Sequence, residues 1–262
     1  MLTSTDGTTV YASLNTDDAV VAINVRTLKV VATYPTGAGT CPASLAQSGR
    51  WLYFSYGCAS GQWASGLGRV DLPTRKAAVL SVNGEHYYSP PLLAAGSNVL
   101  VVGQPDLSPT TVTSFRVSSR GSLTQLSESD FYSDPVSNLR DLVTTADGTQ
   151  VFTAAGAPYV IQQYATSDLT TLVKSYPTTP YPDAVALSAD GTFLAGGSDA
   201  YYDPDIYVFK NGLPTGSIEL NGTLIPGGLA WGPNNHRLYA VTFDPYGSAP
   251  PPPVLHVLTP KG

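Results

Sequence analysis

Short apolar runs alternate with tight polar turns along the whole chain, and the pattern repeats. A run such as 184–188 precedes each marked turn, and further runs such as 19–23 and 29–34 follow it. Asp-Gly between apolar runs is a strong signal for a β-hairpin, because type I′ turns need positive φ at both central residues. The six marked turns are Asp6-Gly7, Ser48-Gly49, Ser97-Asn98, Asp147-Gly148, Asp190-Gly191 and Asn234-Asn235.

The spacing of these turns indicates the fold class. They recur about every 45 residues, with four short strands in a full repeat, which is the period of a propeller blade. No stretch keeps a helical apolar period long enough for a core helix. A β-sandwich is the alternative, but its strands would not recur in sets of four with one marked turn per set. We therefore predict an all-β fold, a β-propeller of four-stranded antiparallel blades, as a single domain over residues 1–262.

The two ends of the chain predict incomplete first and last blades. Residues 1–4 match the tail of an inner strand, and residues 254–257 match a third strand with no outer strand after it. Six blades are therefore visible, and a parent protein of six or seven blades, with further domains, is expected; the alternative is that ring closure borrows a strand.

Two segments carry a resemblance to a known repeat. Residues 10–37 combine Val-Tyr-Ala-Ser-Leu-Asn, Ala-Val-Val-Ala-Ile-Asn and Lys-Val-Val-Ala-Thr-Tyr-Pro-Thr-Gly, and residues 182–191 read Pro-Asp-Ala-Val-Ala-Leu-Ser-Ala-Asp-Gly. These runs resemble the YVTN-type β-propeller repeat. The resemblance implies a secreted or surface-exposed bacterial propeller, often one module of a multidomain protein, and it transfers no catalytic residues.

Composition narrows the classes of partner. Charged residues make up 12% of the chain, and the formal net charge is −6. Binding to nucleic acid or to an acidic membrane requires clustered cations, so neither partner is expected. No apolar run is long enough to span a bilayer, and no signal peptide opens the chain, so membrane insertion is not expected.

Aromatic residues concentrate in the connections expected to share one face of the propeller. The longest of these connections are 83–89, 128–138, 177–183, 198–205 and 243–253. Such rings either pack the loops onto the blades or form a recognition surface, because aromatic side chains give large contact area for little lost entropy. The predicted ligand-binding residues on this face are Trp63, His86, Tyr87, Tyr88, Phe131, Tyr132, Arg140, Tyr181, Asp183, Tyr201, Tyr202 and Tyr246.

Acidic residues accompany the aromatic ones on the same predicted face. An acidic, aromatic-lined surface favours neutral polyols, cationic groups or a bound cation, and it repels phosphate. Asp199, Asp203 and Asp205 are weak candidates for a Ca²⁺ site, although their spacing does not match an EF-hand. Surface Asp also caps turns, which is the alternative for each of them. No zinc spacing occurs, and no other cofactor is expected.

The two cysteines, Cys41 and Cys58, flank the Ser48-Gly49 turn at similar distances. Folding that hairpin brings them nearly opposite each other, so a disulfide is predicted; the alternative is a pair of free thiols in a cytosolic protein. The bridge would pin the 57–65 loop that carries Trp63 and would indicate an oxidising compartment, outside the cell or on its surface.

These features favour a non-catalytic extracellular module that binds a glycan or a protein. The first alternative is a propeller enzyme, such as a lactone hydrolase or lyase, which needs a polar cluster at the central channel. None of the three glutamates lies in a predicted inner strand, and the only candidates at the channel mouth are Arg140, Asp141 and Asp183. Arg140 is expected to pair with an acid. The second alternative is a structural spacer in a larger surface protein.

Overall fold

The computed structural model describes residues 1–59, 61–82, 84, 86–129, 136–198, 205–220, 222–243 and 252–260. The chain forms two compact units. The first unit comprises Met1–Pro105 with Val112–Glu128, and the second comprises Asp106–Thr111 with Ser129–Gly262.

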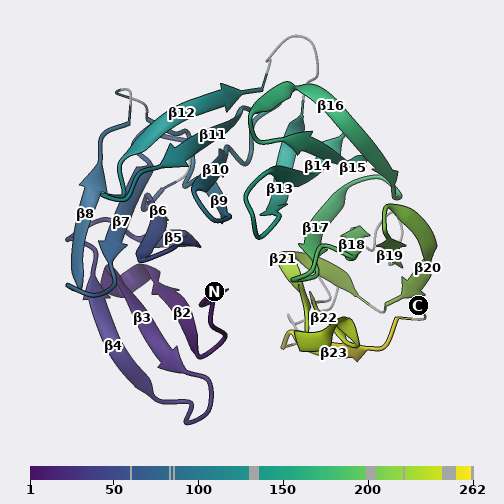
Figure 1. Cartoon of the computed structure of the whole chain (residues 1–262), viewed down its shortest axis with the longest axis horizontal. Helices are drawn as coiled ribbons and strands as arrows, with labels where there is room; N and C mark the ends of the chain where they lie inside the picture. Colours follow the sequence, from purple (N-terminus) through teal and green to yellow (C-terminus); the bar gives the residue numbers. More distant parts are fainter. Residues whose placement is uncertain are drawn as a thin grey trace. The chain divides into compact units, whose positions relative to one another are not determined.

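The first unit contains three antiparallel sheets of four strands, and the strands of each sheet follow one another in chain order (Figure 1). The strands are β1 (Leu2–Thr3), β2 (Thr9–Leu14), β3 (Ala19–Asn24) and β4 (Val30–Pro35); β5 (Pro42–Ser48), β6 (Trp51–Tyr56), β7 (Gly66–Asp71) and β8 (Lys76–Leu80); and β9 (Leu92–Ala95), β10 (Val99–Gly103), β11 (Val112–Val117) and β12 (Leu123–Glu128).

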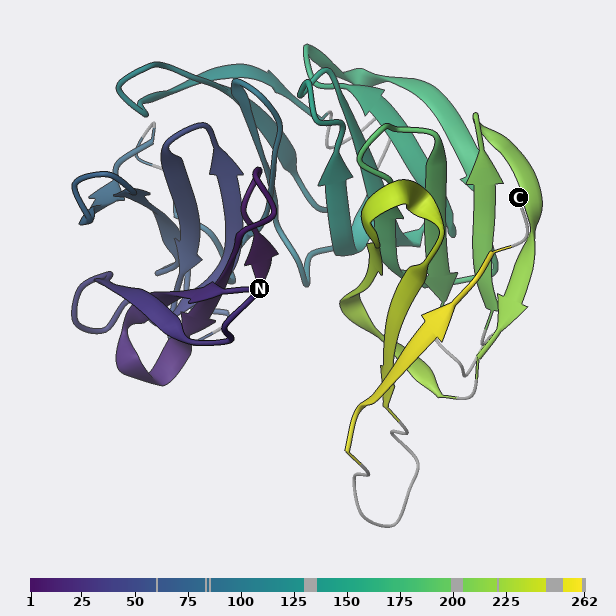
Figure 2. The same cartoon turned by 60° about the horizontal axis from the view of Figure 1, so that its bottom comes forward.

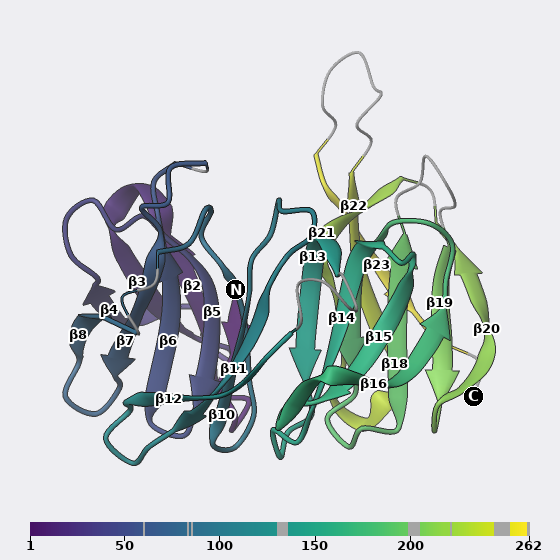
Figure 3. The same cartoon turned by 90° about the horizontal axis from the view of Figure 1, so that it is seen from above.

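The second unit contains two four-stranded sheets and one three-stranded sheet, again in chain order. The strands are β13 (Ser137–Thr144), β14 (Gln150–Ala157), β15 (Val160–Ala165) and β16 (Asp168–Pro177); β17 (Pro182–Leu187), β18 (Phe193–Ser198), β19 (Asp205–Lys210) and β20 (Leu213–Glu219); and β21 (Thr223–Trp231), β22 (Leu238–Phe243) and β23 (Val254–Leu258). Figure 3 shows β13–β16 side by side, and Figure 2 shows β23, in yellow, at the edge of its sheet.

These sheets are the blades of a β-propeller, so the predicted fold class is confirmed. The short first strand β1 and the absence of a fourth strand after β23 among the described residues also match the pattern read from the two ends. The chain contains two short 3-10 helices in the described ranges, and neither is long and apolar enough to cross a membrane.

Apolar cores lie between successive sheets of each unit. In the first unit, Phe54 of the second sheet packs with Val20 of the first, and Tyr53 packs with Phe115 of the third. In the second unit, Phe152 of the first sheet packs with Phe209 of the second. Ile206 of the second sheet and Leu238 of the third belong to another core. Middle strands such as β3 are covered on both faces, which explains why they read as continuous apolar runs.

The marked turns are present, but the Asp-Gly turns differ from the expected type I′ form; in the Asn234-Asn235 turn both residues have positive φ, as that form requires. In the Asp6-Gly7 turn only Gly7 has positive φ, and the Gly7 N–H donates to the Ser4 carbonyl. This is a type I turn followed by a left-handed glycine. The aspartate keeps its ordinary backbone conformation because its carboxylate accepts bonds from the flanking residues, here Ser4 Oγ and the Thr8 N–H.

Candidate functional site

The predicted disulfide between Cys41 and Cys58 is confirmed, with a Cα–Cα distance of 5.0 Å. It joins the β4–β5 connection to the β6–β7 loop. Asp18 also holds the β4–β5 connection, because its carboxylate accepts the Cys41 N–H at 2.8 Å and the Gly39 N–H at 2.7 Å. These backbone bonds, that of Cys41 first, lower the pKa of Asp18. The start of the β6–β7 loop is therefore covalently fixed to a well-bonded support.

The β6–β7 loop presents Trp63 to solvent. Trp63 is 54% exposed, has φ +50°, and lies edge-on to Tyr88 with 5.4 Å between ring centroids. Tyr88 belongs to the β8–β9 connection, which binds the loop through its backbone: the Gly61 N–H donates to the Tyr88 carbonyl at 2.8 Å. We call these two rings the Trp63–Tyr88 pair.

The residues next to Tyr88 were also predicted to bind a ligand. His86 is exposed, as a surface role requires. Tyr87 is only 4% exposed and packs in the core with Leu67 and Leu93, so its side chain is not available to a ligand. Tyr87 forms an antiparallel bridge with Ser65, and this pairing places its ring in the core while its neighbour Tyr88 remains accessible. Of the two roles considered for these aromatic rings, Tyr87 therefore has the packing role.

The second unit carries an equivalent pair of rings. Tyr159, in the β14–β15 turn, and Tyr181, in the β16–β17 connection, lie with ring centroids 5.2 Å apart. Tyr159 is 42% exposed, and both residues have positive φ, +67° and +58°. A hydrogen bond with Tyr181 is the largest cause that raises the pKa of Tyr159. We call these rings the Tyr159–Tyr181 pair.

Tyr159 was not predicted as a site residue. The sequence feature that could have identified Tyr159 is its place in the blade. It lies in the connection between the second and third strands, as Trp63 does in the first unit. That equivalence becomes visible only when the strands are aligned blade by blade, since the β14–β15 turn is short and carries a single aromatic residue.

Arg140 and Asp183 form an ion pair in the second unit. Arg140 Nε lies 3.0 Å from Asp183 Oδ1; the side chain of Asp183 is 7% exposed and that of Arg140 is 40% exposed. Both residues sit at irregularities of the first strands of their sheets, between Leu139 and Asp141 and between Pro182 and Ala184. The expectation that Arg140 pairs with an acid is confirmed.

Asp141 links neighbouring first strands. Its carboxylate accepts the Val185 N–H of β17 at 2.9 Å and the Leu142 N–H at 2.8 Å. The residue as a whole keeps some contact with solvent, but protein encloses its carboxyl group, and this burial raises its pKa to about 7. In the first unit Ser44 has the same role, because its Oγ accepts the Leu93 N–H of β9 at 3.0 Å.

Other predicted residues lie outside the described residues. These are Phe131, Tyr132, Tyr201, Tyr202, Tyr246, Asp199 and Asp203. Asp205 is the first residue of β19, opposite Glu219 in the strand register. Within the described ranges, no group of three or more His, Cys, Asp or Glu residues is arranged to hold a metal ion. Glu128 and Glu219 lie on the outer strands β12 and β20.

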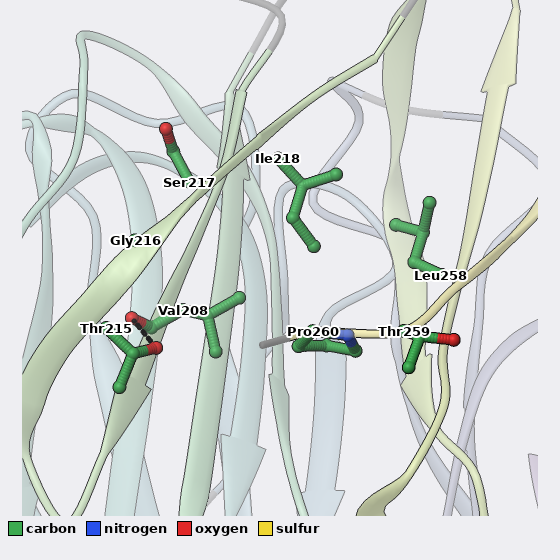
Figure 4. Close-up of a pocket in the computed structure, with 8 residues that line it drawn as sticks. All are labelled: Val208, Thr215, Gly216, Ser217, Ile218, Leu258, Thr259 and Pro260. Carbon is green, nitrogen blue, oxygen red and sulfur yellow. Dashed lines mark hydrogen bonds between the residues drawn. The ribbon is translucent and has the colours of Figure 1, made fainter. Parts of the chain in front are cut away.

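A pocket of about 420 Å³ lies between β20 and the end of β23 (Figure 4). Ile218 and Leu258 extend toward the space between these strands, and Pro260 lies below it. The lining has no charged side chain: Val208, Thr215, Gly216, Ser217, Ile218, Leu258, Thr259 and Pro260. The pocket therefore offers apolar contact and hydroxyl groups but no acid–base chemistry.

Comparisons with known proteins support the fold. No protein-family model and no curated protein matches the sequence. The structure is similar to a chain in the crystal structure of a mitotic checkpoint complex, at 16% identity and TM-score 0.65, covering 94% of this chain and 74% of that one. It is also similar to a functionally unknown protein from Desulfotomaculum acetoxidans, at 16% identity and TM-score 0.71, covering 99% and 88%. Both similarities show the propeller fold, and the YVTN-type resemblance stays a prediction.

Proposed function

We propose that this chain is an extracellular, non-catalytic module that binds carbohydrate on exposed aromatic rings at the loop ends of its blades. One observation carries the proposal. Among the described residues, Trp63 and Tyr159 are the only exposed Phe, Trp or Tyr side chains, and they occupy equivalent connections in different blades. Each lies against a tyrosine from the connection that leads to the next sheet.

The backbone at these positions supports a functional reason for the exposure. A bulky residue with positive φ is uncommon, and holding it there costs about 1–3 kcal/mol unless the surrounding structure compensates. Trp63 and Tyr159 both have this conformation. Exposing a large ring also forgoes the stabilisation that its burial would give. Strain and exposure together at these two rings support a binding role.

The surroundings of the rings favour a sugar over a protein partner. Protein interfaces centre on contiguous apolar patches that become fully buried. The large exposed aliphatic residues instead lie mostly on the outer strands, as do Val30 of β4, Val79 of β8 and Val173 of β16. A single ring among polar loop residues matches the apolar face of one sugar ring, whose hydroxyl groups remain hydrated or bonded to neighbouring polar groups.

Two further observations support binding outside the cell without catalysis. The Cys41–Cys58 disulfide is of the kind that persists in oxidising compartments. Each acid or base candidate has a structural engagement: Arg140 bonds to Asp183, and Asp141 accepts two backbone N–H groups. A catalytic centre would need such groups directed at a substrate.

A glycan panel tests the proposal. Wild-type chain, Trp63→Ala, Tyr159→Ala and Val79→Ala are compared, the last as a control that removes an exposed apolar side chain from an outer strand. We expect selective retention of a glycan by the wild type and by Val79→Ala, with at least a tenfold loss in one or both aromatic variants, since covering a large apolar side chain contributes about 1.5–3 kcal/mol. Retention that is equal in all four proteins, or no retention by the wild type, contradicts the proposal.

A further inference from the structure

The guanidinium of Arg140 is held in place but only partly used. Its Nε donates to Asp183 Oδ1, and this is the polar contact that the described residues make with it. Asp183 is buried, so the anchor is firm, whereas 40% of the Arg140 side chain is exposed. Arginine carries five N–H donors in a planar fork. The Nη donors therefore remain available to an external acceptor.

A tyrosine ring packs where the two chain segments that carry this ion pair meet. A Cβ at Gly156 would lie 2.9 Å from the Tyr181 ring and 3.0 Å from the Cβ of Asn138, so the ring packs directly over that glycine. Tyr181 and Asn138 each stand two residues before a partner in the ion pair, Asp183 and Arg140. The ring contact and the ion pair thus connect the same two chain segments and lie near each other.

The backbone in this cluster has an uncommon conformation at three positions. Asn138, Tyr159 and Tyr181 all have positive φ, between +53° and +67°. Positive φ is uncommon for a tyrosine, and strained residues of this kind cluster at ligand-binding positions, which supports a binding role for this cluster.

We propose that Arg140, Tyr159 and Tyr181 form a subsite for a carboxylate-bearing sugar, such as a uronic or sialic acid residue. The inference deepens the proposed carbohydrate binding and rests on it. The Nη donors of Arg140 bind the sugar carboxylate, and the exposed ring of Tyr159 covers the apolar face of the sugar. Planar, bidentate recognition of a carboxylate is the task for which the arginine fork is suited.

The charge of the site selects a singly charged group. Asp183 neutralises Arg140, and the chain as a whole carries a formal net charge of −6. Long-range attraction therefore does not assist binding, and a doubly charged phosphate is repelled more strongly than a carboxylate. The preference arises from directed hydrogen bonds to one carboxylate.

The experiment compares each acidic glycan with its own neutral form. Oligomers of galacturonic, glucuronic and sialic acid are titrated calorimetrically into the full chain, as free acids and as methyl esters. For at least one of them we expect the wild type to bind the acid about tenfold more tightly than the ester, which is the value of one charge-assisted hydrogen bond. Equal affinities, or no binding of any acid, overturn the inference.

Variants assign the preference to Arg140. Arg140→Lys keeps the charge and the ion pair but removes the fork, while the double variant Arg140→Gln with Asp183→Asn removes the arginine together with the charge of its buried acid. Both should reduce the acid-to-ester ratio to about 1–3, and Arg26→Gln, at an exposed turn residue of the first unit, should leave it unchanged. A ratio that survives the double variant overturns the inference.

Two further arms separate this inference from the proposed function. Trp63→Ala should weaken a glycan held by the first unit without changing the acid-to-ester ratio. If neutral glycans still depend on Trp63 but no acid preference exists, the proposed function stands and the subsite fails. Arg140-dependent binding of poly-glutamate as tight as that of the sugars would make the ligand an acidic peptide and also overturns the inference.

Discussion

The two units support the same kind of ring pair in different ways. In the first unit, Trp63 is carried by a long β6–β7 loop that a disulfide and backbone bonds to the β8–β9 connection hold in place. In the second unit, Tyr159 occupies a short β14–β15 turn with no covalent support. Both residues nevertheless have positive φ, and their exposed fractions are similar, 54% for Trp63 and 42% for Tyr159. The position within the blade, rather than the length of the loop, therefore fixes where the ring is presented.

Removing the disulfide should produce the largest difference between the two units, because only the first unit contains it. Replacing both cysteines, Cys41→Ser with Cys58→Ser, releases a cross-link between residues 17 apart in sequence. The free energy of unfolding should fall by about 3 kcal/mol, because the unfolded chain is no longer constrained.

Chemical denaturation measures this loss, and the glycan panel measures its consequence. Binding that depends on Trp63 should weaken, while binding that depends on Tyr159 should persist. An equal loss of both would show that the two ring pairs are not independently supported.

Gly156→Ala should disturb the ring pair of the second unit alone. The added Cβ would lie under 3.0 Å from the Tyr181 ring, so the ring must move. Overpacking of this kind costs about 1–3 kcal/mol. In a double-mutant cycle, the same substitution in a Tyr181→Ala background should cost less, since the ring is gone. Equal costs in both backgrounds would mean that Tyr181 does not pack over Gly156.

Asp141 and Ser44 give a second comparison between the units. Each accepts a backbone N–H from the neighbouring first strand, but only the carboxylate of Asp141 can carry a charge. Burial raises the pKa of Asp141 to about 7, so the folded state binds a proton that the unfolded chain releases near pH 4. The contribution of Asp141 to the free energy of unfolding should therefore be highest below pH 4 and decline as pH rises toward 7. Asp141→Asn should remove this decline and gain about 2 kcal/mol at pH 8, allowing for the residue's partial contact with solvent.

Ser44 supplies the control for that experiment. Ser44→Ala removes the acceptor of the Leu93 N–H and should cost about 1 kcal/mol at every pH, because a hydroxyl does not titrate in this range. Urea denaturation at several pH values measures both effects. If Asp141→Asn retains the wild-type decline between pH 4 and pH 7, another group is responsible for it.

The aspartates of the marked turns should give the smallest effect, with the opposite sign. Hydrogen bonds from the Thr192 N–H and the Ser188 hydroxyl, in that order, lower the pKa of Asp190 to about 2. Stability from this turn is therefore present above pH 4 and lost as pH falls toward 2. Asp190→Asn should flatten the acid limb of the stability profile slightly. An unchanged limb would show that the turn carboxylate contributes nothing.

The fold was predictable because its signals are local. The Asp6-Gly7, Asp147-Gly148 and Asp190-Gly191 turns mark the blades, and the strand spacing around them sets the period. The disulfide followed from the same reasoning, since the Ser48-Gly49 hairpin determines how far apart Cys41 and Cys58 lie. The turn type was wrong for the Asp-Gly turns because periodicity does not report where a carboxylate finds its hydrogen bonds.

The site was less predictable because it depends on packing across sheets. Tyr87 and Tyr88 are adjacent and chemically identical, yet one is buried and the other lies against Trp63. The antiparallel pairing of Tyr87 with Ser65 distinguishes them. Tyr159 was missed because its importance comes from its equivalence to Trp63. The anchoring of Arg140 by Asp183 was predicted in kind, although its acid partner was not identified from the sequence.

The most direct test of the central claim is hydroxyl-radical footprinting of the wild-type chain with the glycan that it retains best. Our account predicts strong protection at Trp63, at Tyr159 or at both, with no change at Trp51 and Trp231, which lie on β6 and β21. Protection confined to the outer strands, with Trp63 and Tyr159 as reactive as in the free chain, would contradict it.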